Sequence, residues 1–302
     1  SILHASCREV LIMTPQQLVQ EVSQLFTLPD VAIRLNELIA AADSSTGDLV
    51  EVIQLDPGLA AAVLKLANSA HYGLVARVDS IPRAIAVIGE RELQVMAMAT
   101  SVTTTFRGLP ADLVDMATFW DNSVTCGVIA RLLGRRCRIP KTEQLFLAGL
   151  LHAVGRLVFY ARRPEEYRAL LGAAEPTDEP SLAAAERRVF GFDYATLGAA
   201  LLKSWNLPVM LQVLVACQLR PGEATDCARA AALLHVANSV AAGLSPTLKG
   251  VAASQAGPAD FDPVAWALLG LNEAVLAEVV QEASSQSLEI LAIINPCAAV
   301  IY

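Results

Sequence analysis

The sequence has no apolar run long enough to cross a membrane. A transmembrane helix needs about 18 uncharged apolar residues, and the richest stretch, 228–244, is interrupted by Arg, His and Asn. The N-terminal stretch 1–13 carries His4, Arg8 and Glu9 and no clear cleavage site. We therefore predict no secretory signal, no membrane association and a cytoplasmic location.

Paired cysteines and the common catalytic motifs are also missing. The six cysteines lie far apart without a CxxC pair, which excludes a zinc cage or a disulfide framework and is typical of a reducing compartment. The sequence has no GxSxG, GxxxxGK[ST] or HExxH motif, and its four histidines are scattered. These absences argue against the nucleophilic and P-loop enzyme classes and against a zinc protease.

Charge is scarce and mostly acidic. Charged residues make up 17% of the chain, and 22 Lys+Arg against 30 Asp+Glu give a net charge of −8. Nucleic acid is therefore not an expected partner, because binding to phosphates needs clustered cations. One basic run is a candidate patch for a nucleotide phosphate or an acidic partner, the alternative being a solvated helix end. It contains Arg131, Arg135, Arg136, Arg138 and Lys141.

Apolar residues, in contrast, make up 54% of the chain and recur with helical spacing almost throughout. The pattern predicts an all-α protein with a substantial core. We predict helices over 31–39, from Thr46, from Asp56-Pro57 to Asn68, over 80–89 and 90–105, from Asp112 to Arg136, over 141–160, from Asp193 to Trp205, from Pro208, and over 263–294 as a pair. Several of these starts rest on a capping side chain or a proline. We predict surface loops over 172–180 and 246–262.

Three local motifs are more specific than the helical spacing. The first is Asp56-Pro57-Gly58-Leu59 followed by Asn68-Ser69-Ala70-His71-Tyr72-Gly73. The second is the stretch 147–157, LAGLLHAVGRL. The third combines Glu186, Phe190-Gly191, Gly198-Ala199 and Trp205-Asn206-Leu207-Pro208.

In this order the motifs resemble the HDOD domain, the HD-related output domain of bacterial signalling proteins, from about Leu28 to Pro221. The resemblance implies an all-α, multi-helix bundle with an HD-like helical core. We expect an N-terminal segment over 1–27, an HDOD domain over 28–245 (an N-terminal bundle over 28–108 and the HD-like core over 109–245) and a C-terminal loop and helical tail over 246–302. The motif residues expected to be structural are Asp56, Pro57, Asn68, Ser69, Tyr72, Gly73, Gly149, Gly155, Gly198, Trp205, Leu207 and Pro208.

HD and HD-GYP phosphohydrolases, which HDOD domains resemble, hold divalent metals with His and Asp. The positions that match those ligands are occupied here by Asn122, His152, Ala153, Tyr194, Gln218, Leu219 and Asn238. Only His152 keeps a ligand type, and a catalytic zinc takes about three protein ligands. We therefore predict no metal, no cofactor and no catalytic residue, and a vestigial pocket at these seven positions.

Buried polar groups must be paired, so we expect a hydrogen-bonded network of Asn122, His152, Tyr194, Gln218 and Asn238 at the former metal position. His152 is either an anchor for a small ligand or a buried histidine bonded to a carbonyl. The expected function is a non-catalytic regulatory module that binds signalling proteins, or a small-molecule or nucleotide ligand. The alternatives are a metal-dependent HD-type phosphohydrolase acting on a cyclic dinucleotide and a nucleic-acid-binding regulator.

Overall fold

The structure, a computed structural model, describes residues 13–41, 44–174, 178–245 and 257–295 and contains helices and no strand within them. This confirms the all-α fold class. The first part of the chain contains α1 (Pro15–Val22), α2 (Asp30–Ala40), α3 (Thr46–Gln54), α4 (Pro57–Ala67), the 3-10 turn η1 (Ala70–Tyr72), α5 (Ile81–Ile88) and α6 (Glu90–Thr105). The remainder contains α7 (Met116–Arg136), α8 (Thr142–Leu151), α9 (Val154–Arg162), α10 (Pro164–Ala174), α11 (Glu179–Phe190), α12 (Tyr194–Ser204), α13 (Val209–Cys217), η2 (Pro221–Glu223), α14 (Ala228–Leu244), η3 (Pro258–Asp260), α15 (Pro263–Leu269) and α16 (Glu273–Ile294).

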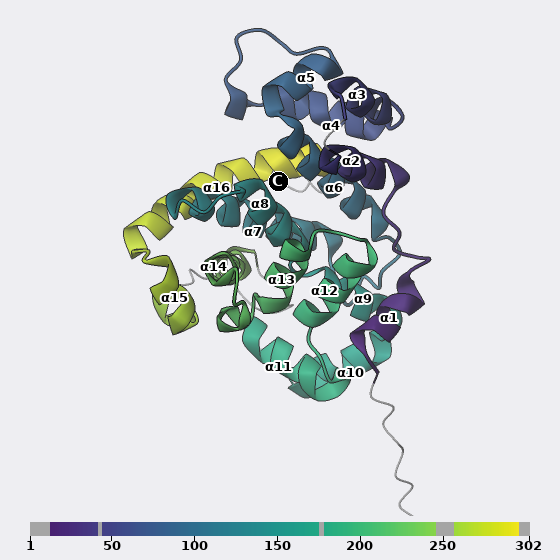
Figure 1. Cartoon of the computed structure of the whole chain (residues 1–302). Helices are drawn as coiled ribbons and strands as arrows, with labels where there is room; N and C mark the ends of the chain where they lie inside the picture. Colours follow the sequence, from purple (N-terminus) through teal and green to yellow (C-terminus); the bar gives the residue numbers. More distant parts are fainter. Residues whose placement is uncertain (1–12, 42–43, 175–177, 246–256, 296–302) are drawn as a thin grey trace, which may run out of the picture.

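Helices α3, α4 and α5 form an upper lobe above a larger body that is built around α7, α8, α12, α13 and α14 (Figure 1). The long C-terminal helix α16 runs along the boundary and packs against α7 in the body and against α4 and α6 above it. Buried apolar side chains from Leu18 to Ile294 form one continuous core. The helical tail is therefore an integral part of the packing between lobe and body.

Eight of the sixteen α-helices in the described residues begin next to a side chain that caps them. The Asp56 carboxylate accepts hydrogen bonds from the backbone N–H groups of Gly58 (2.9 Å) and Leu59 (3.0 Å), and Pro57 occupies the first position of α4. The predicted cap of the long helix, Asp112, is wrong. Asp115 caps α7 instead, and the Asp112 carboxylate pairs with Arg168, because a buried turn at 113–114 separates it from the helix.

The predicted surface loop over 172–180 is also wrong at both of its ends. Helix α10 continues to Ala174, and α11 begins at Glu179. The Asp178 carboxylate accepts a hydrogen bond from the Ser181 N–H (2.8 Å), in the manner of a capping box. Pro180 lies in the first turn of α11, where its missing N–H does no harm. Most of the second predicted loop, 246–256, lies outside the described residues, and η3 occupies 258–260.

Two of the motif glycines allow helices to approach closely. A Cβ built on Gly149 would lie 2.5 Å from the Cα of Gly127, which brings α8 against α7. A Cβ on Gly155 would lie 2.0 Å from the carbonyl oxygen of Tyr194 and 2.6 Å from the N of Gly198. These contacts fix α9 against α12 and so set the spacing of the helices that carry the polar core of the body.

The Asn68 side chain ends α4 as predicted. Its amide donates to the carbonyls of Leu64 (2.8 Å) and Val78 (2.7 Å), and its oxygen accepts from the Val78 N–H. Such bonds from a side chain to the backbone compete with continuation of the helix. Asn68 therefore both terminates α4 and ties it to the segment that leads into α5.

The other motif residues stabilise turns and corners. Gly73 follows η1 with a positive φ of 57°, a conformation that glycine adopts without steric cost. The Trp205 indole N–H donates to the carbonyl of Phe26 (2.8 Å), Leu207 is buried, and Pro208 precedes α13. These residues have structural roles, as the motifs predict.

One stretch of the described chain, Thr142–Arg162, is long and apolar enough by composition to cross a membrane. In the fold it consists of α8 and α9, and 89% of its most apolar window is buried. A helix that is hydrophobic all round is expected in a protein core. Burial against the rest of the fold therefore accounts for its composition.

Candidate functional site

A hydrogen-bonded polar cluster lies inside the body where α8, α12, α13 and α14 meet. The Asn238 amide donates to the Tyr194 hydroxyl (3.0 Å) and to Gln218 Oε1 (3.1 Å). The Gln218 amide donates in turn to the backbone carbonyls of His152 (2.8 Å) and Val215 (2.9 Å). The side chains of Tyr194, Gln218 and Asn238 are buried, as is His152, which joins the cluster through its backbone carbonyl.

His152 lies at the carboxyl end of α8, and its ring is enclosed by the fold. The Nδ1–H donates to the carbonyl oxygen of Gly149, 2.7 Å away. Burial lowers the pKa of the imidazole from 6.5 to about 4, although the hydrogen bond to Gly149 and the charge of Glu179 oppose the shift. Burial acts in this direction because it disfavours the charged form of a histidine. The histidine is therefore neutral at physiological pH and bonded to a backbone carbonyl.

The remaining positions of the expected vestigial pocket are not part of this polar cluster. Asn122 is buried on α7, but its amide donates to the carbonyl of Ser245 (2.9 Å), at the end of α14 and away from Asn238. Ala153 is buried between α8 and α9, and Leu219 is partly buried against the core. The expected network is thus wrong for Asn122, because Asn238 and Ser245 lie two helical turns apart. It is also wrong for the His152 side chain, which bonds to Gly149, so that His152 joins the cluster only through its backbone carbonyl.

A buried charge network adjoins this cluster, and the sequence reasoning did not identify it. The Arg156 guanidinium, on α9, pairs with Glu179 (2.6 Å) and Glu186 (3.1 Å) on α11. Glu186 also accepts from the Tyr167 hydroxyl (2.6 Å) and from the Tyr194 N–H (2.7 Å). Arg156 lies over the Tyr194 ring at 3.9 Å. This cation–π contact joins the charge network to the polar cluster.

The pKa values of this network follow from burial and pairing. Burial alone lowers the pKa of Arg156, but Glu179 and Glu186 outweigh it and hold that pKa well above its ordinary value. Burial raises the pKa of Glu186, and the Arg156 charge and the hydrogen bonds from Tyr167 and Tyr194 oppose the rise. The sequence held two signals of this network: Arg156 lies within the second motif, and Glu186 is an acidic residue within the third.

The residues at the positions that match the HD metal ligands do not fit a divalent ion. Within the part of the chain that the structure describes, no group of three or more His, Cys, Asp and Glu could hold a metal. The amides of Gln218 and Asn238 bond to each other and to neighbouring groups, and His152 uses Nδ1 on Gly149. The donor set is neutral and largely self-paired, which suits a polar core and not metal coordination.

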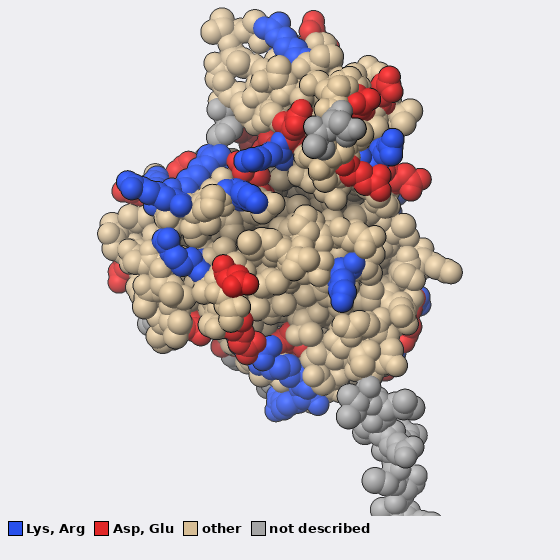
Figure 2. All heavy atoms as spheres, viewed as in Figure 1, with Lys and Arg blue, Asp and Glu red and all other residues tan. Residues whose placement is uncertain are grey.

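The basic run does not form a continuous solvated patch. Arg131 is buried and pairs with Glu92 (3.2 Å), so the prediction of a solvated helix end is wrong there. Arg136 pairs with Glu278 (2.7 Å) and Glu282 on α16. Figure 2 shows acidic and basic side chains intermingled along the boundary beneath the upper lobe. Among the described residues, Arg135, Arg138 and Lys141 are the members of this run that are exposed and form no ion pair.

Comparison with known proteins identifies the family. The model of the HDOD domain matches residues 25–221, which is more than half of the chain. The chain belongs to the HDOD family. The match begins close to the predicted start at Leu28 and ends at the predicted position, Pro221. It includes the polar cluster of this HDOD chain up to Gln218.

Two solved structures share most of the fold. A protein named "Putative phosphohydrolase" from Shewanella amazonensis SB2B is 25% identical, with a TM-score of 0.72 over 92% of this chain and 97% of that one. A "Putative signal transduction protein" from Marinobacter aquaeolei VT8 is 24% identical, with a TM-score of 0.68 over 91% of this chain and 60% of that one. The similarity therefore extends beyond residues 25–221 to the C-terminal helices.

A curated relative, an uncharacterized protein from Treponema pallidum (strain Nichols), is 28% identical over 186 residues. The alignment covers 60% of this chain but only 35% of that protein. The matched part of this HDOD chain therefore spans about a third of the length of the relative.

We expect the Asn238→Leu variant of this HDOD domain to lose about 1–3 kcal/mol of unfolding free energy. Leucine fills a similar volume but leaves the Tyr194 hydroxyl and Gln218 Oε1 without their donor. Urea unfolding followed by circular dichroism measures the loss. The matched control is Ser239→Ala, which removes one hydroxyl that bonds to the His235 carbonyl within α14. Equal losses in both variants would contradict a role for the cluster.

The depressed pKa of His152 makes the stability of the HDOD fold depend on pH. The unfolded chain takes up a proton near pH 6.5, while the folded state resists protonation down to about pH 4. The free energy of unfolding should therefore fall as the pH drops through this window, by about 1.5 kcal/mol between pH 6.5 and 5. In the His152→Gln variant, denaturant titrations should show that this fall in the unfolding free energy is lost. An unchanged dependence of the unfolding free energy on pH would contradict the explanation.

Proposed function

We propose that this HDOD chain is a non-catalytic signal-transduction module that acts by binding a partner protein or a small ligand. The observation that carries the proposal is the set of neutral, mutually bonded groups at positions that match the HD metal ligands. A hydrolase of the HD type needs metal-bound hydroxide next to phosphorus. Membership of the HDOD family supports the regulatory part of the proposal.

The character of the polar core supports the same proposal. An active site keeps open coordination positions and unpaired groups for its substrate. Here Gln218 and Asn238 are hydrogen-bonded side chains, and the close contacts at Gly149 and Gly155 press the surrounding helices together. A core that holds its helices in one arrangement suits a rigid output module.

Metal analysis combined with a hydrolysis assay tests the proposal. The purified chain is incubated with Mn²⁺, Fe²⁺ or Zn²⁺, desalted, analysed for bound metal and assayed with a cyclic dinucleotide and with bis(p-nitrophenyl) phosphate. We expect neither stoichiometric metal nor turnover. Bound metal together with turnover that His152→Ala abolishes would overturn the proposal and establish the phosphohydrolase alternative suggested by the name of the Shewanella relative.

The nucleic-acid alternative has its own test. Arg131 and Arg136 are engaged in ion pairs, so the basic run offers only Arg135, Arg138 and Lys141 to a phosphate backbone, and the net charge of −8 opposes binding. We therefore expect no mobility shift of DNA or RNA at low salt. A salt-dependent shift that is lost in Arg135→Ala would favour nucleic-acid binding over the proposed module.

A further inference from the structure

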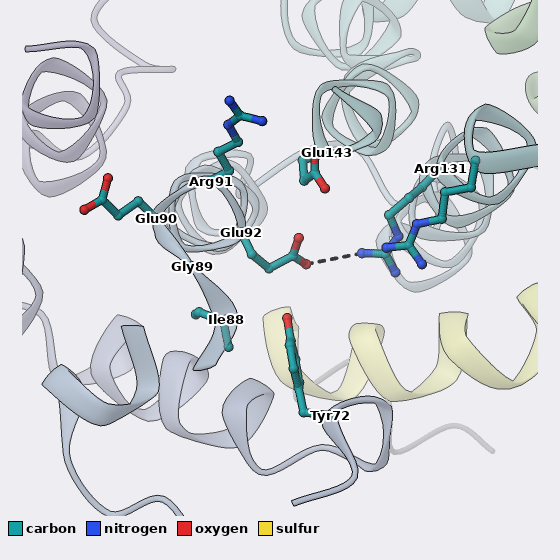
Figure 3. A pocket seen from close by; sticks show the side chains of 9 residues that line it. Tyr72, Ile88, Gly89, Glu90, Arg91, Glu92, Arg131 and Glu143 are labelled. Carbon is teal, nitrogen blue, oxygen red and sulfur yellow. Dashed lines mark hydrogen bonds and ion pairs between the residues drawn. The ribbon is translucent and has the colours of Figure 1, made fainter. Parts of the chain in front are cut away.

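A cleft of about 560 Å³ lies between the upper lobe and the body, at the corner where α5 ends and α6 begins. Its walls come from η1, the α5–α6 corner, the last turns of α7 and the start of α8. Figure 3 shows the cleft from close by. The lining residues that matter for its chemistry are Tyr72, Glu92, Arg131, Arg135 and Glu143.

Two sequence features that the polar core does not use meet at this cleft. The first motif contributes Tyr72, whose hydroxyl points toward the Glu92–Arg131 pair in Figure 3. The basic run contributes Arg131 and Arg135 from α7. The two features lie far apart in the sequence, and only the packing of the helices brings them together.

Arg131 is the buried cation of the cleft, and its hydrogen bonding is incomplete. Its two terminal nitrogens bond to Glu92 (3.2 Å) and Gln286 (3.4 Å), and the guanidinium lies over the Phe146 ring at 5.1 Å. Its Nε and the Ser69 hydroxyl are buried without a hydrogen-bond partner among the described residues. Both residues also line a cavity of about 20 Å³ beside the cleft. A cavity of that size is large enough for one water molecule.

The charges around the cleft are mixed. Arg135 is exposed at the rim and has no ion-pair partner in the described part of the chain, and α6 begins there without a side-chain cap and with Glu90 and Glu92 in its first turn. Burial raises the pKa of Tyr72 to about 12, so the phenol is protonated and able to donate at neutral pH. Glu92 is neutralised by Arg131, and Glu143 lies on the wall of the cleft.

We propose that this cleft binds a purine nucleotide as the input ligand of the module. Arg135 suits a phosphate, whereas the Glu143 carboxylate suits the exocyclic amino group of a purine and, in guanine, the ring N–H beside it. The inference rests on the proposed regulatory function and names its ligand class. Because the walls belong to both lobe and body, a bound nucleotide holds the two parts in one relative arrangement.

Calorimetric titration of the full chain tests the proposal with GMP, AMP and ribose 5-phosphate as probes. We expect GMP or AMP to bind one to one with a Kd below about 1 mM, and ribose 5-phosphate to bind at least about tenfold more weakly. Arg135→Ala should weaken nucleotide binding about tenfold, because it removes a charged hydrogen bond. The matched control is Arg83→Ala, an exposed arginine on α5 outside the cleft.

The outcomes separate this inference from the proposed function. Absence of nucleotide binding up to about 5 mM, or binding that Arg135→Ala leaves unchanged, would overturn the cleft proposal. Ribose 5-phosphate binding as tightly as GMP would overturn the purine assignment. Neither result bears on whether the chain is catalytic. Conversely, metal-dependent hydrolysis of a phosphodiester would overturn the non-catalytic role and leave nucleotide binding by the cleft intact.

Discussion

Gly155→Ala is expected to destabilise the fold by roughly 3 kcal/mol or more, so that little folded protein is recovered. The added Cβ would lie 2.0 Å from the Tyr194 carbonyl oxygen, and this neighbour is backbone that cannot rotate away. Helices α9 and α12 would have to separate, which would also disturb the Tyr194 N–H bond to Glu186. Thermal unfolding and soluble yield measure the effect.

Two other glycines provide controls for this variant. A Cβ on Gly198 would meet a methyl of Val215 at 3.3 Å and the N of Gly155 at 3.4 Å, so Gly198→Ala should lose less stability than Gly155→Ala. A Cβ on Gly172, which is exposed within α10, would meet nothing within 4 Å. Gly172→Ala should therefore stabilise the protein by up to about 1 kcal/mol. Similar losses at all three positions would contradict the close-approach explanation.

Arg156→Met should destabilise the protein by roughly 3–5 kcal/mol. The change leaves the buried carboxylates of Glu179 and Glu186 without their cation. Methionine replaces part of the volume of the side chain, so the lost charge dominates the effect. The double variant Arg156→Met with Glu186→Gln should recover part of the loss. Chemical denaturation of the single and double variants measures both effects.

The control is Arg168→Met, which removes a cation from an exposed pair with Asp112 and Glu165. It should change stability by less than about 1 kcal/mol.

The pH dependence of the unfolding free energy gives a second check. Without Arg156, burial raises the pKa of Glu186, so the folded variant binds a proton more tightly than the unfolded chain. The difference in unfolding free energy between wild type and Arg156→Met should therefore become smaller as the pH falls from 7 to 5. A difference that stays constant would contradict this account.

Much of the fold follows from local features of the sequence. Helical spacing, the Asp56 and Asp193 caps and the Gly89 helix end place most of the predicted helices within a few residues of their observed bounds. These features act over three or four residues, so they can be read without knowing the packing. Where two candidates compete locally, as Asp112 and Asp115 do, the sequence alone could not choose.

The candidate site was likewise predicted in part from local features and in part decided by packing. The alignment of motifs with the HDOD family brought out four buried positions, those of His152, Tyr194, Gln218 and Asn238, which the fold joins in one cluster. Asn122 is buried as well, yet it bonds to Ser245. The way in which α7 lies against α14 decides between these two outcomes, and nothing in the sequence of either helix records it.

What the sequence by itself determined is the all-α class and the family, because each depends on residue types and their local spacing. Tertiary structure decided which charges are buried: Arg156 finds Glu186 across 30 positions, and Arg131 finds Glu92 across 39. The physical reason is that an ion pair between distant helices requires their crossing geometry. The whole core sets that geometry at once, through contacts such as that of Gly155 with Tyr194.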